Sequence, residues 1–310
     1  MSAPGTVPAV SAAPETPAWV PGAVAASGAR LVPLGTETEG LLWFGPLGVD
    51  GLGPALRSAP RARWVQLPSA GVDAALDAGL IDADRTWTSA KGSFAEPVAE
   101  HALALTLAAL RRLPERARAR TWGVEAGLSL FDAHVLVLGA GGIARTYLEL
   151  LAPFRTRNVV VRRRPDPVPG ADRVVTGEGL IDELGRADVV VLAAALTDRT
   201  RALLGADELA AMRPGATLVN IARGELVDTD ALVAALRSGQ VGAAALDVTA
   251  PEPLPDGHPL WELPTALVTP HTADTPEMVE PLLRRRVEEN LRRFVAGDTL
   301  EGVVDPTTGY

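Results

Sequence analysis

The sequence predicts an α/β protein of two domains, each built on a doubly wound parallel sheet, with the smaller domain assembled from both ends of the chain. Strand-like and helix-like segments alternate, and most strand-like segments of the second half are short apolar runs, as in sheets covered by helices on both faces. A glycine-rich turn at 139–144 opens the regular part of this alternation. At 310 residues the chain is also long enough for two domains.

The first part of the chain shows the alternation weakly. We expect a first strand at 6–10, although prolines lie in and beside it, then a short helix at 17–29 and extended segments at 30–34 and 41–44. Residues 61–76 predict a strand, a tight turn at 69–71 and a helix. Asp73 lies early in that helix, where the macrodipole favours a negative charge.

Residues 94–112 give the strongest helix signal in the chain. Pro97 lies near the start, as helices favour, and Pro114 follows the expected end. Apolar residues recur at helical spacing, at Val98, Ala102, Leu105, Ala109 and Leu113. We expect one helix, long enough to pass from one domain to the other.

Regular alternation begins after residue 134. The expected strands span 135–138, 158–161, 189–193, 217–221, 242–246 and 266–269, enough for one doubly wound domain. A last helix is expected at 277–296, broken near Pro281, and it returns to the first domain because the N-terminal segment has too few elements to close its own core. We therefore expect a discontinuous substrate domain of residues 1–95 and 280–310, and a dinucleotide-binding domain of residues 96–279.

Composition excludes several kinds of function. The net charge of −9 disfavours a nucleic-acid partner, which would need a basic face. The chain has no cysteine, so disulfides and thiolate zinc sites are excluded, and we expect no metal centre. No apolar run approaches the ~20 residues of a membrane span. The first 18 residues contain no Lys or Arg, so we expect neither a signal nor a transit peptide, and the cytoplasm is the expected location.

The glycine-rich turn follows an apolar strand, opens a helix and fits the pattern G-x-G-x-x-G/A. Gly139 permits the tight turn, Gly141 lets the backbone approach a pyrophosphate, and Ala144 lets helix and strand pack closely. Gly142 and Ile143 open the helix, whose N-terminus attracts the anion. We expect a Rossmann-like dinucleotide site here rather than a plain turn.

The residues after the second strand of this domain favour NADP(H) over NAD(H). About 20 residues beyond the glycines, an NAD site would carry an acidic side chain that binds the ribose 2′-hydroxyl. Here Arg162, Arg163 and Arg164 follow the strand, and Asp166 comes later, behind a proline. With no carboxylate expected to repel a 2′-phosphate, the guanidiniums can bind one in bidentate fashion. The alternative is a solvated basic rim.

A cation, a carboxylate and an imidazole follow later strands, at Arg223, Glu252 and His271. Ligands of such sheets collect where the strands end, and a guanidinium there suits a planar carboxylate with an adjacent carbonyl. Glu252 lies in a proline-stiffened loop and is a candidate for orienting His271 and stabilising its protonated form. The alternative for Arg223 is a surface ion pair with Glu225 or Asp228.

The other three histidines are expected to be structural or exposed. His101 lies within the long helix, His134 precedes a strand as a surface residue, and His258 lies in a loop. His271 differs because it follows the end of a strand, where catalytic side chains are commonly displayed.

Taken together, these strings resemble the D-isomer-specific 2-hydroxyacid dehydrogenases, a family that includes glyoxylate/hydroxypyruvate reductases and phosphoglycerate dehydrogenases. The strings are GAGGIA (139–144), NIARGELVD (220–228), PEPLP (251–255) and TPHTAD (269–274), preceded by QLPSAGVD (66–73) and AEHALALTLAALRR (99–112). The match covers about residues 65–274, and the first sixty residues match only loosely.

The resemblance implies a division of roles. Arg223 would bind the carboxylate and carbonyl of the substrate, and His271 would be the acid/base, assisted by Glu252. Backbone amides near Ala70 and Gly71 would hold the carboxylate.

The resemblance also implies cofactor contacts from several loops. These come from Ala195, Thr200, Ala222 and Asp247, the last to the nicotinamide carboxamide. The chain departs from the family at Ala195, where a proline is usual, and at Arg162, where an acidic residue is usual.

The expected function is reversible hydride transfer between a nicotinamide cofactor and a small 2-oxo acid, giving a D-2-hydroxy acid. A glyoxylate- or hydroxypyruvate-like substrate is favoured because segment 43–51, expected to border the pocket, offers no cluster of cations for a phosphate. The alternatives are a phosphoglycerate dehydrogenase-like enzyme and a non-catalytic dinucleotide sensor of the same fold. The family also implies a homodimer.

Overall fold

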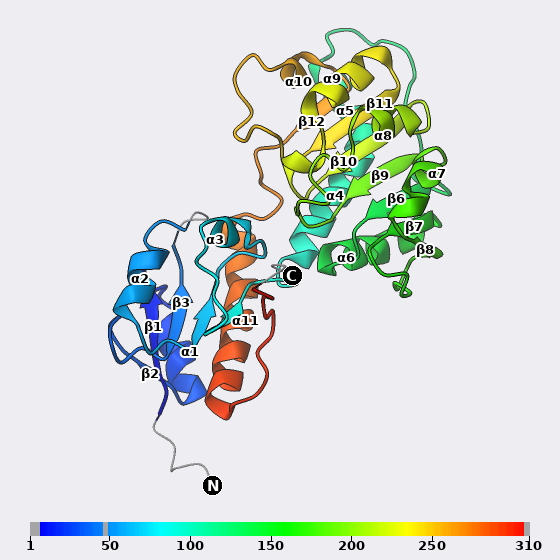
Figure 1. Cartoon of the computed structure of the whole chain (residues 1–310). Coiled ribbons are helices and arrows are strands. Elements are labelled where there is room, and N and C mark those ends of the chain that lie inside the picture. Colours follow the sequence, from blue (N-terminus) through cyan, green and yellow to red (C-terminus); the bar gives the residue numbers. More distant parts are fainter. Residues whose placement is uncertain (1–6, 46–48, 307–310) are drawn as a thin grey trace. The chain divides into compact units, whose positions relative to one another are not determined.

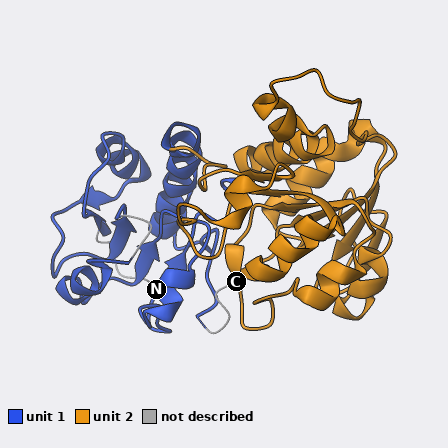
Figure 2. Ribbon diagram, turned by 90° about the horizontal axis from the view of Figure 1, so that it is seen from above, with its two compact units in different colours: residues 1–94, 276–310 blue, residues 95–275 orange. Residues whose placement is uncertain are grey.

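The computed structural model describes residues 7–45 and 49–306. The chain divides into two compact units (Figure 2): unit 1 comprises Met1–Phe94 and Pro276–Tyr310, and unit 2 comprises Ala95–Thr275. The boundaries expected from the sequence lay one residue later at the first junction and four residues later at the second.

Unit 1 contains a five-stranded, all-parallel sheet in the order β2-β1-β3-β4-β5. Its strands are β1 (Ala9–Ala13), β2 (Arg30–Leu31), β3 (Gly40–Trp43), β4 (Trp64–Gln66) and β5 (Thr86–Thr88). The strand order reverses between β1 and β3, so this sheet is doubly wound. β1 begins three residues later than expected, after Pro8, and residue 6 lies outside the described residues. The sequence did not indicate β5, which is only three residues long.

Helices cover both faces of the first sheet (Figure 1). The helices α1 (Val20–Ser27) and α11 (Pro276–Ala296) share one apolar cluster with β1, β3 and β4. On the other face lie α2 (Leu52–Ser58), which the sequence did not indicate, and α3 (Asp73–Asp77).

The helix α11 continues through Pro281, so the break expected there is wrong. Proline removes one backbone hydrogen bond, and Pro281 lies on the exposed N-terminal part of the helix. The side chains that bury α11 lie beyond it, at Val287, Leu291 and Phe294. Their packing outweighs the single lost bond.

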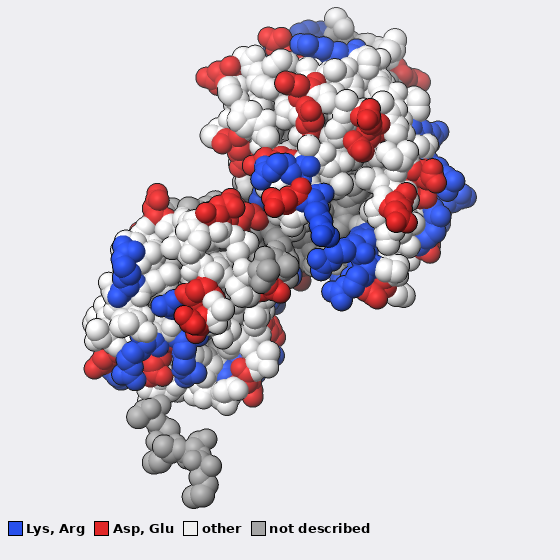
Figure 3. Space-filling view, viewed as in Figure 1, with Lys and Arg blue, Asp and Glu red and all other residues white. Residues whose placement is uncertain are grey.

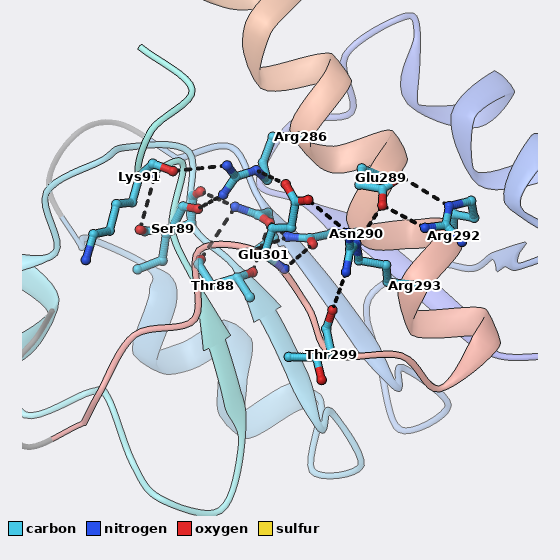
Figure 4. A network of polar contacts seen from close by, with 12 residues as sticks. Thr88, Ser89, Lys91, Arg286, Glu289, Asn290, Arg292, Arg293, Thr299 and Glu301 are labelled. Carbon is cyan, nitrogen blue, oxygen red and sulfur yellow. Dashed lines mark hydrogen bonds and ion pairs between the residues drawn. The ribbon is translucent and has the colours of Figure 1, made fainter. Parts of the chain in front are cut away.

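A buried polar network joins α11 to the sheet of unit 1 (Figure 4). Asn290 Nδ2 donates to Gln66 Oε1 at 2.8 Å, and Thr88 Oγ1 donates to the same oxygen at 2.9 Å. These three side chains are at most 2% exposed. The Asn290 side chain also bonds the backbone of Glu301 through both its oxygen and its nitrogen. Since buried amides require partners, this network fixes how the C-terminal helix docks on its sheet.

Unit 2 contains a seven-stranded, all-parallel sheet in the order β12-β11-β10-β9-β6-β7-β8. Its strands are β6 (His134–Leu138), β7 (Arg157–Val161), β8 (Arg173–Val175), β9 (Val189–Leu192), β10 (Ala216–Asn220), β11 (Val241–Leu246) and β12 (Ala266–Val268). All six expected strands are confirmed to within a residue at each end. The seventh, β8, is a short and incompletely buried edge strand, which left no apolar run to detect.

Helices also cover both faces of the second sheet. The helices α4 (Ala95–Leu110) and α6 (Gly142–Leu151) pack together, and α4 lies along β10 and β11. The helices α7 (Leu180–Leu184), α8 (Ala206–Ala211), α9 (Thr229–Ser238) and α10 (Pro259–Glu262) pack on the apolar cluster of the other face. The strand order reverses between β6 and β9, which is where doubly wound sheets bind ligands.

The long helix ends two residues earlier than expected. Arg112 adopts a left-handed backbone conformation (φ 53°), and the short helix α5 (Leu113–Arg118) begins immediately after it. Pro114 therefore lies in the first turn of a new helix, a position that proline favours, rather than beyond the end of the old one.

Within the described part of the chain, no helix combines the length and apolar character needed to cross a membrane. On the face drawn in Figure 3, basic and acidic side chains are interspersed rather than separated into one broad basic and one broad acidic area.

Candidate active site

Three neighbouring strands of unit 2 end at one edge of the sheet, and each is followed by a residue singled out from the sequence. Arg223 follows β10, Asp247 follows β11, and His271 follows β12. Because the strands are parallel and adjacent, their carboxyl ends meet at the same edge.

His271 and Glu252 form a direct pair. His271 Nδ1 lies 2.6 Å from Glu252 Oε1, and both side chains are about 40% exposed. The His271 backbone has a φ of 49°, which is uncommon for a residue with a side chain. Its N–H is shared between the carbonyls of Asp247, at 2.8 Å, and Thr269, at 3.0 Å. The carboxylate therefore fixes which ring nitrogen faces away, leaving Nε2 available for chemistry.

The loop that carries Arg223 is shaped by Asn220, which is 1% exposed. Its Nδ2 donates to Arg223 O at 2.9 Å, and its Oδ1 accepts from the N–H of Ala222 at 3.0 Å. The Arg223 guanidinium donates from Nη1 to Ala222 O at 2.7 Å. This buried amide therefore sets the direction in which the chain leaves β10.

Gly224 brings the loop of Arg223 against the loop of Glu252. A Cβ at Gly224 would lie 2.0 Å from the carbonyl carbon and oxygen of Thr249, which is impossible for any side chain. Thr249 N in turn lies 3.4 Å from Glu252 Oε2 and donates to it. The absence of a side chain at Gly224 thus allows two functional loops to touch.

Asp247 is the most completely satisfied carboxylate of the site. It is 2% exposed; Oδ1 accepts from Thr269 Oγ1 at 2.5 Å and from Thr272 N at 2.9 Å, and Oδ2 accepts from Ala273 N at 3.1 Å. His101 Nε2 lies 3.3 Å from Oδ1. Burial alone would raise the pKa of Asp247, but these hydrogen bonds outweigh it and lower the pKa to about 2. Asp247 is therefore an ionised clamp that holds the turn after β12, including His271.

Asp274 is a second carboxylate close to the pair. Burial raises its pKa above the ordinary value for aspartate, and the charge of Asp247 acts in the same direction. The charges of His271 and Arg223 oppose this increase. Asp274 therefore lies near both His271 and Arg223.

The glycine-rich turn has the geometry of a pyrophosphate cradle. Gly139 has a φ of 117°, and a Cβ there would lie 2.4 Å from Ala193 O at the end of β9. A Cβ on Gly141 would meet nothing within 4 Å, so the space over the turn is open. The helix α6 begins at Gly142, with Ile143 next, and Ala144 is fully buried against the sheet. An open cradle at a helix N-terminus fits a dinucleotide.

One of the three arginines after β7, Arg162, has a carboxylate partner. The expectation that no carboxylate stands beside these arginines is therefore wrong. Arg162 Nη2 lies 3.6 Å from Asp166 Oδ2, and Arg162 Nη1 donates to Asp166 O at 3.3 Å. The proline between them does not carry Asp166 away, because the turn folds back on Arg162. Arg163 and Arg164, which follow Arg162 directly, are exposed.

The loop after β9 is held by Thr200. Its hydroxyl donates to Ala195 O at 2.7 Å and accepts from Thr197 N at 2.8 Å. These bonds close the loop without the proline that the family usually has at residue 195.

The expected carboxylate-binding loop lies in unit 1, directly after β4. Ala90 N donates to Ser69 O at 2.8 Å, and Ser69 Oγ donates to Gly71 O at 2.6 Å. Among the described residues, no acceptor receives the amide N–H of Ala70 or Gly71. These two donors are thus available to an anion.

Sequence reasoning missed several residues of this arrangement. His101 and Thr269 contact Asp247, and Asn220 orients the Arg223 loop. The only available signals were polar residues inside otherwise apolar elements. His134 was also misjudged: it begins β6, its side chain is 21% exposed, and burial lowers its pKa although Glu183 lies nearby.

Comparisons with known proteins agree with this geometry. The family model "D-isomer specific 2-hydroxyacid dehydrogenase, NAD binding domain" matches residues 103–273. The chain is 38% identical over 268 residues to the "uncharacterized protein in proB 3′region" of Corynebacterium melassecola, covering 84% of this chain and 88% of that protein. It is 32% identical over 267 residues to the glyoxylate reductase of Aeropyrum pernix, covering 81% and 78%.

Longer relatives and solved structures are also similar. The D-3-phosphoglycerate dehydrogenase of Mycobacterium tuberculosis is 35% identical over 81% of this chain, which spans 47% of that protein's length. A D-isomer specific 2-hydroxyacid dehydrogenase from Xanthobacter autotrophicus, solved in complex with NADPH and MES, has a TM-score of 0.84. It is 29% identical to this chain, and the match covers 98% of this chain and 100% of that one.

Proposed function

The chain belongs to the D-isomer specific 2-hydroxyacid dehydrogenase family and is an oxidoreductase, and we propose that it reduces a small 2-oxo acid to the D-2-hydroxy acid with NADP(H). The observation that carries this proposal is the 2.6 Å His271–Glu252 pair, which stands at the sheet edge that also presents Arg223. A binding protein has no need of such an acid/base pair, so a non-catalytic sensor is disfavoured.

Each residue has a distinct task in this proposal. The Arg223 guanidinium binds the substrate carboxylate and polarises the adjacent carbonyl. His271, paired with Glu252, donates a proton from Nε2 to the carbonyl oxygen and takes it back in the reverse direction. In unit 1, the amide N–H groups of Ala70 and Gly71 are the proposed donors to a substrate carboxylate. A reduced nicotinamide cofactor, its pyrophosphate held at the cradle of residues 139–144, would supply the hydride to C2.

The proposal is tested by NADPH oxidation with glyoxylate, hydroxypyruvate and 3-phosphohydroxypyruvate. We expect turnover with the first two, and turnover with the third alone would favour the phosphoglycerate dehydrogenase-like alternative suggested by the M. tuberculosis relative. Tight NADPH binding without oxidation by any 2-oxo acid would instead support the sensor.

The preference for NADP(H) rests on the arginines after β7. Arg162 is held in place by Asp166, at 3.6 Å, and Arg163 follows at the same edge. A guanidinium binds a 2′-phosphate in bidentate fashion, and Asp166 competes with that phosphate for Arg162. The relative solved with NADPH supports the same cofactor.

We expect the wild type to have a lower KM for NADPH than for NADH, and Arg162→Asp to raise the NADPH KM by about tenfold or more, the worth of one charged hydrogen bond. Asp166→Asn is expected to lower it. Arg155→Asp makes the same charge change before β7, at the opposite edge of the sheet. It should leave the ratio of the KM for NADPH to the KM for NADH unchanged. A wild type that prefers NADH would contradict the assignment.

The proposed assembly is a homodimer. Large apolar side chains are exposed in the segment that follows α4, with Trp122 98%, Val124 79% and Leu128 56% exposed. Large exposed apolar side chains gathered in one segment are a feature of protein interfaces. A molecular mass of one chain in light scattering at micromolar concentration would contradict this assignment.

A further inference from the structure

A small apolar hollow in unit 1 lies beside the loop proposed to bind the substrate carboxylate. Its walls come from the end of β3, the start of α2 and the segment after β4, and include Trp43, Leu52, Leu67, Ser69, Gly71 and Val72. Ser69 and Gly71 belong both to this hollow and to the carboxylate loop. A 2-oxo acid held by the amides of Ala70 and Gly71 would therefore have its remaining substituent close to the hollow.

The hollow is small and uncharged. Its volume is about 30 Å³, which is room for about two water molecules. Among the described residues that line it, none is Lys, Arg or His. Burying a phosphate or a second carboxylate there would leave a charge without a partner, which is strongly unfavourable.

Trp43 is the largest side chain of the wall, and its position is fixed. It is 4% exposed. A Cβ on Gly45 would lie 2.6 Å from the Trp43 ring, and one on Gly51 would lie 3.5 Å from its Cη2, so glycine backbone packs closely against the indole on two sides. The indole Nε1 has no hydrogen-bond partner within the described part of the chain. Trp43 therefore contributes its volume to the wall, and not a hydrogen bond.

We propose that Trp43 determines substrate size, so that the enzyme favours 2-oxo acids whose substituent is small and uncharged. Glyoxylate, pyruvate and hydroxypyruvate meet this description. The branched substituent of 4-methyl-2-oxopentanoate is larger, and that of 3-phosphohydroxypyruvate is both larger and charged. This inference rests on the proposed function and identifies its substrate class.

The test compares kcat/KM for 4-methyl-2-oxopentanoate with that for glyoxylate, using NADPH. Trp43→Leu enlarges the hollow and is expected to raise this ratio by about tenfold or more, because pocket volume discriminates by ~10–200-fold per methylene. Trp43→Phe removes less volume than Trp43→Leu and no hydrogen bond, so its ratio should lie between those of the wild type and Trp43→Leu.

Trp87→Leu is the matched control. Trp87 is 1% exposed, belongs to the same apolar cluster, and also has an Nε1 without a partner among the described residues, but it does not line the hollow. It should lower stability comparably without changing the ratio.

The outcomes separate this inference from the proposed function. If the wild type reduces no 2-oxo acid, the proposed function fails. If the wild type is active but folded Trp43→Leu keeps the wild-type ratio, or Trp87→Leu changes the ratio equally, only the role of Trp43 is overturned.

Discussion

Replacement of His271 by alanine is expected to lower kcat for 2-oxo acid reduction by ~10²–10⁴-fold, the usual contribution of a general acid. The variant loses the imidazole that pairs with Glu252, at 2.6 Å, while the Asp247 clamp that shapes the turn remains. The NADPH dissociation constant, measured by fluorescence, should change little. Added imidazole should restore part of the activity.

Glu252→Gln should have a smaller effect than the loss of the imidazole itself. A charged hydrogen bond is worth about 1.5–3 kcal/mol, which corresponds to a loss of about 10- to 100-fold in rate. His258→Ala is the control for His271→Ala, because the His258 side chain caps α10 by accepting a hydrogen bond from Leu260 N. Wild-type activity in His271→Ala would remove the imidazole from the proposed chemistry.

Replacement of Arg223 by lysine is expected to raise the KM for the 2-oxo acid and to lower kcat as well. Lysine keeps the charge but cannot bind a carboxylate in bidentate fashion. The loss in kcat/KM should reach about 10²–10³-fold, the cost of removing one preorganised donor from a developing oxyanion. The loop itself should persist, because Asn220 binds the backbone of Ala222 and Arg223 rather than the guanidinium.

Arg155→Lys serves as the control for Arg223→Lys. Arg155 pairs with Asp132 on the surface of unit 2, and its side chain is 64% exposed. Surface ion pairs of this kind contribute little to stability. We therefore expect kcat/KM to remain within about twofold of the wild type, which corresponds to a few tenths of a kcal/mol. Equal losses in the two variants would mean that the loss in Arg223→Lys reflects stability and not bidentate binding of the substrate; no loss in Arg223→Lys would mean that Arg223 acts only through its charge.

Much of the second unit could be predicted because its strands are apolar runs with turn signals between them. The parallel order then follows from the helices between strands, and it places Arg223, Asp247 and His271 at one edge. The strand β8 could not be predicted from the sequence, because an edge strand of three residues has no continuous apolar pattern. In α11, the cost of Pro281 is local, whereas the packing that preserves the helix is tertiary and invisible in a local pattern.

The supporting residues of the site could not be predicted for a similar reason. His101 is 146 positions before Asp247 in the chain, and their contact exists only because α4 lies on β11. Asn220 looks like an ordinary polar residue at the end of a strand until its two loop hydrogen bonds are seen. Asp166 was visible, but its return to Arg162 depends on the geometry of one turn.

The most direct measurement follows the hydride itself. NADPH deuterated at both C4 positions is incubated with hydroxypyruvate and the wild-type protein, and the product is analysed by NMR and chiral chromatography. Hydride transfer to C2 with protonation from His271 predicts D-glycerate with one deuterium at C2 in every molecule formed. Product without deuterium at C2, the L isomer, or no product under saturating substrate would contradict the assignment of Arg223, Glu252 and His271 to 2-oxo acid reduction.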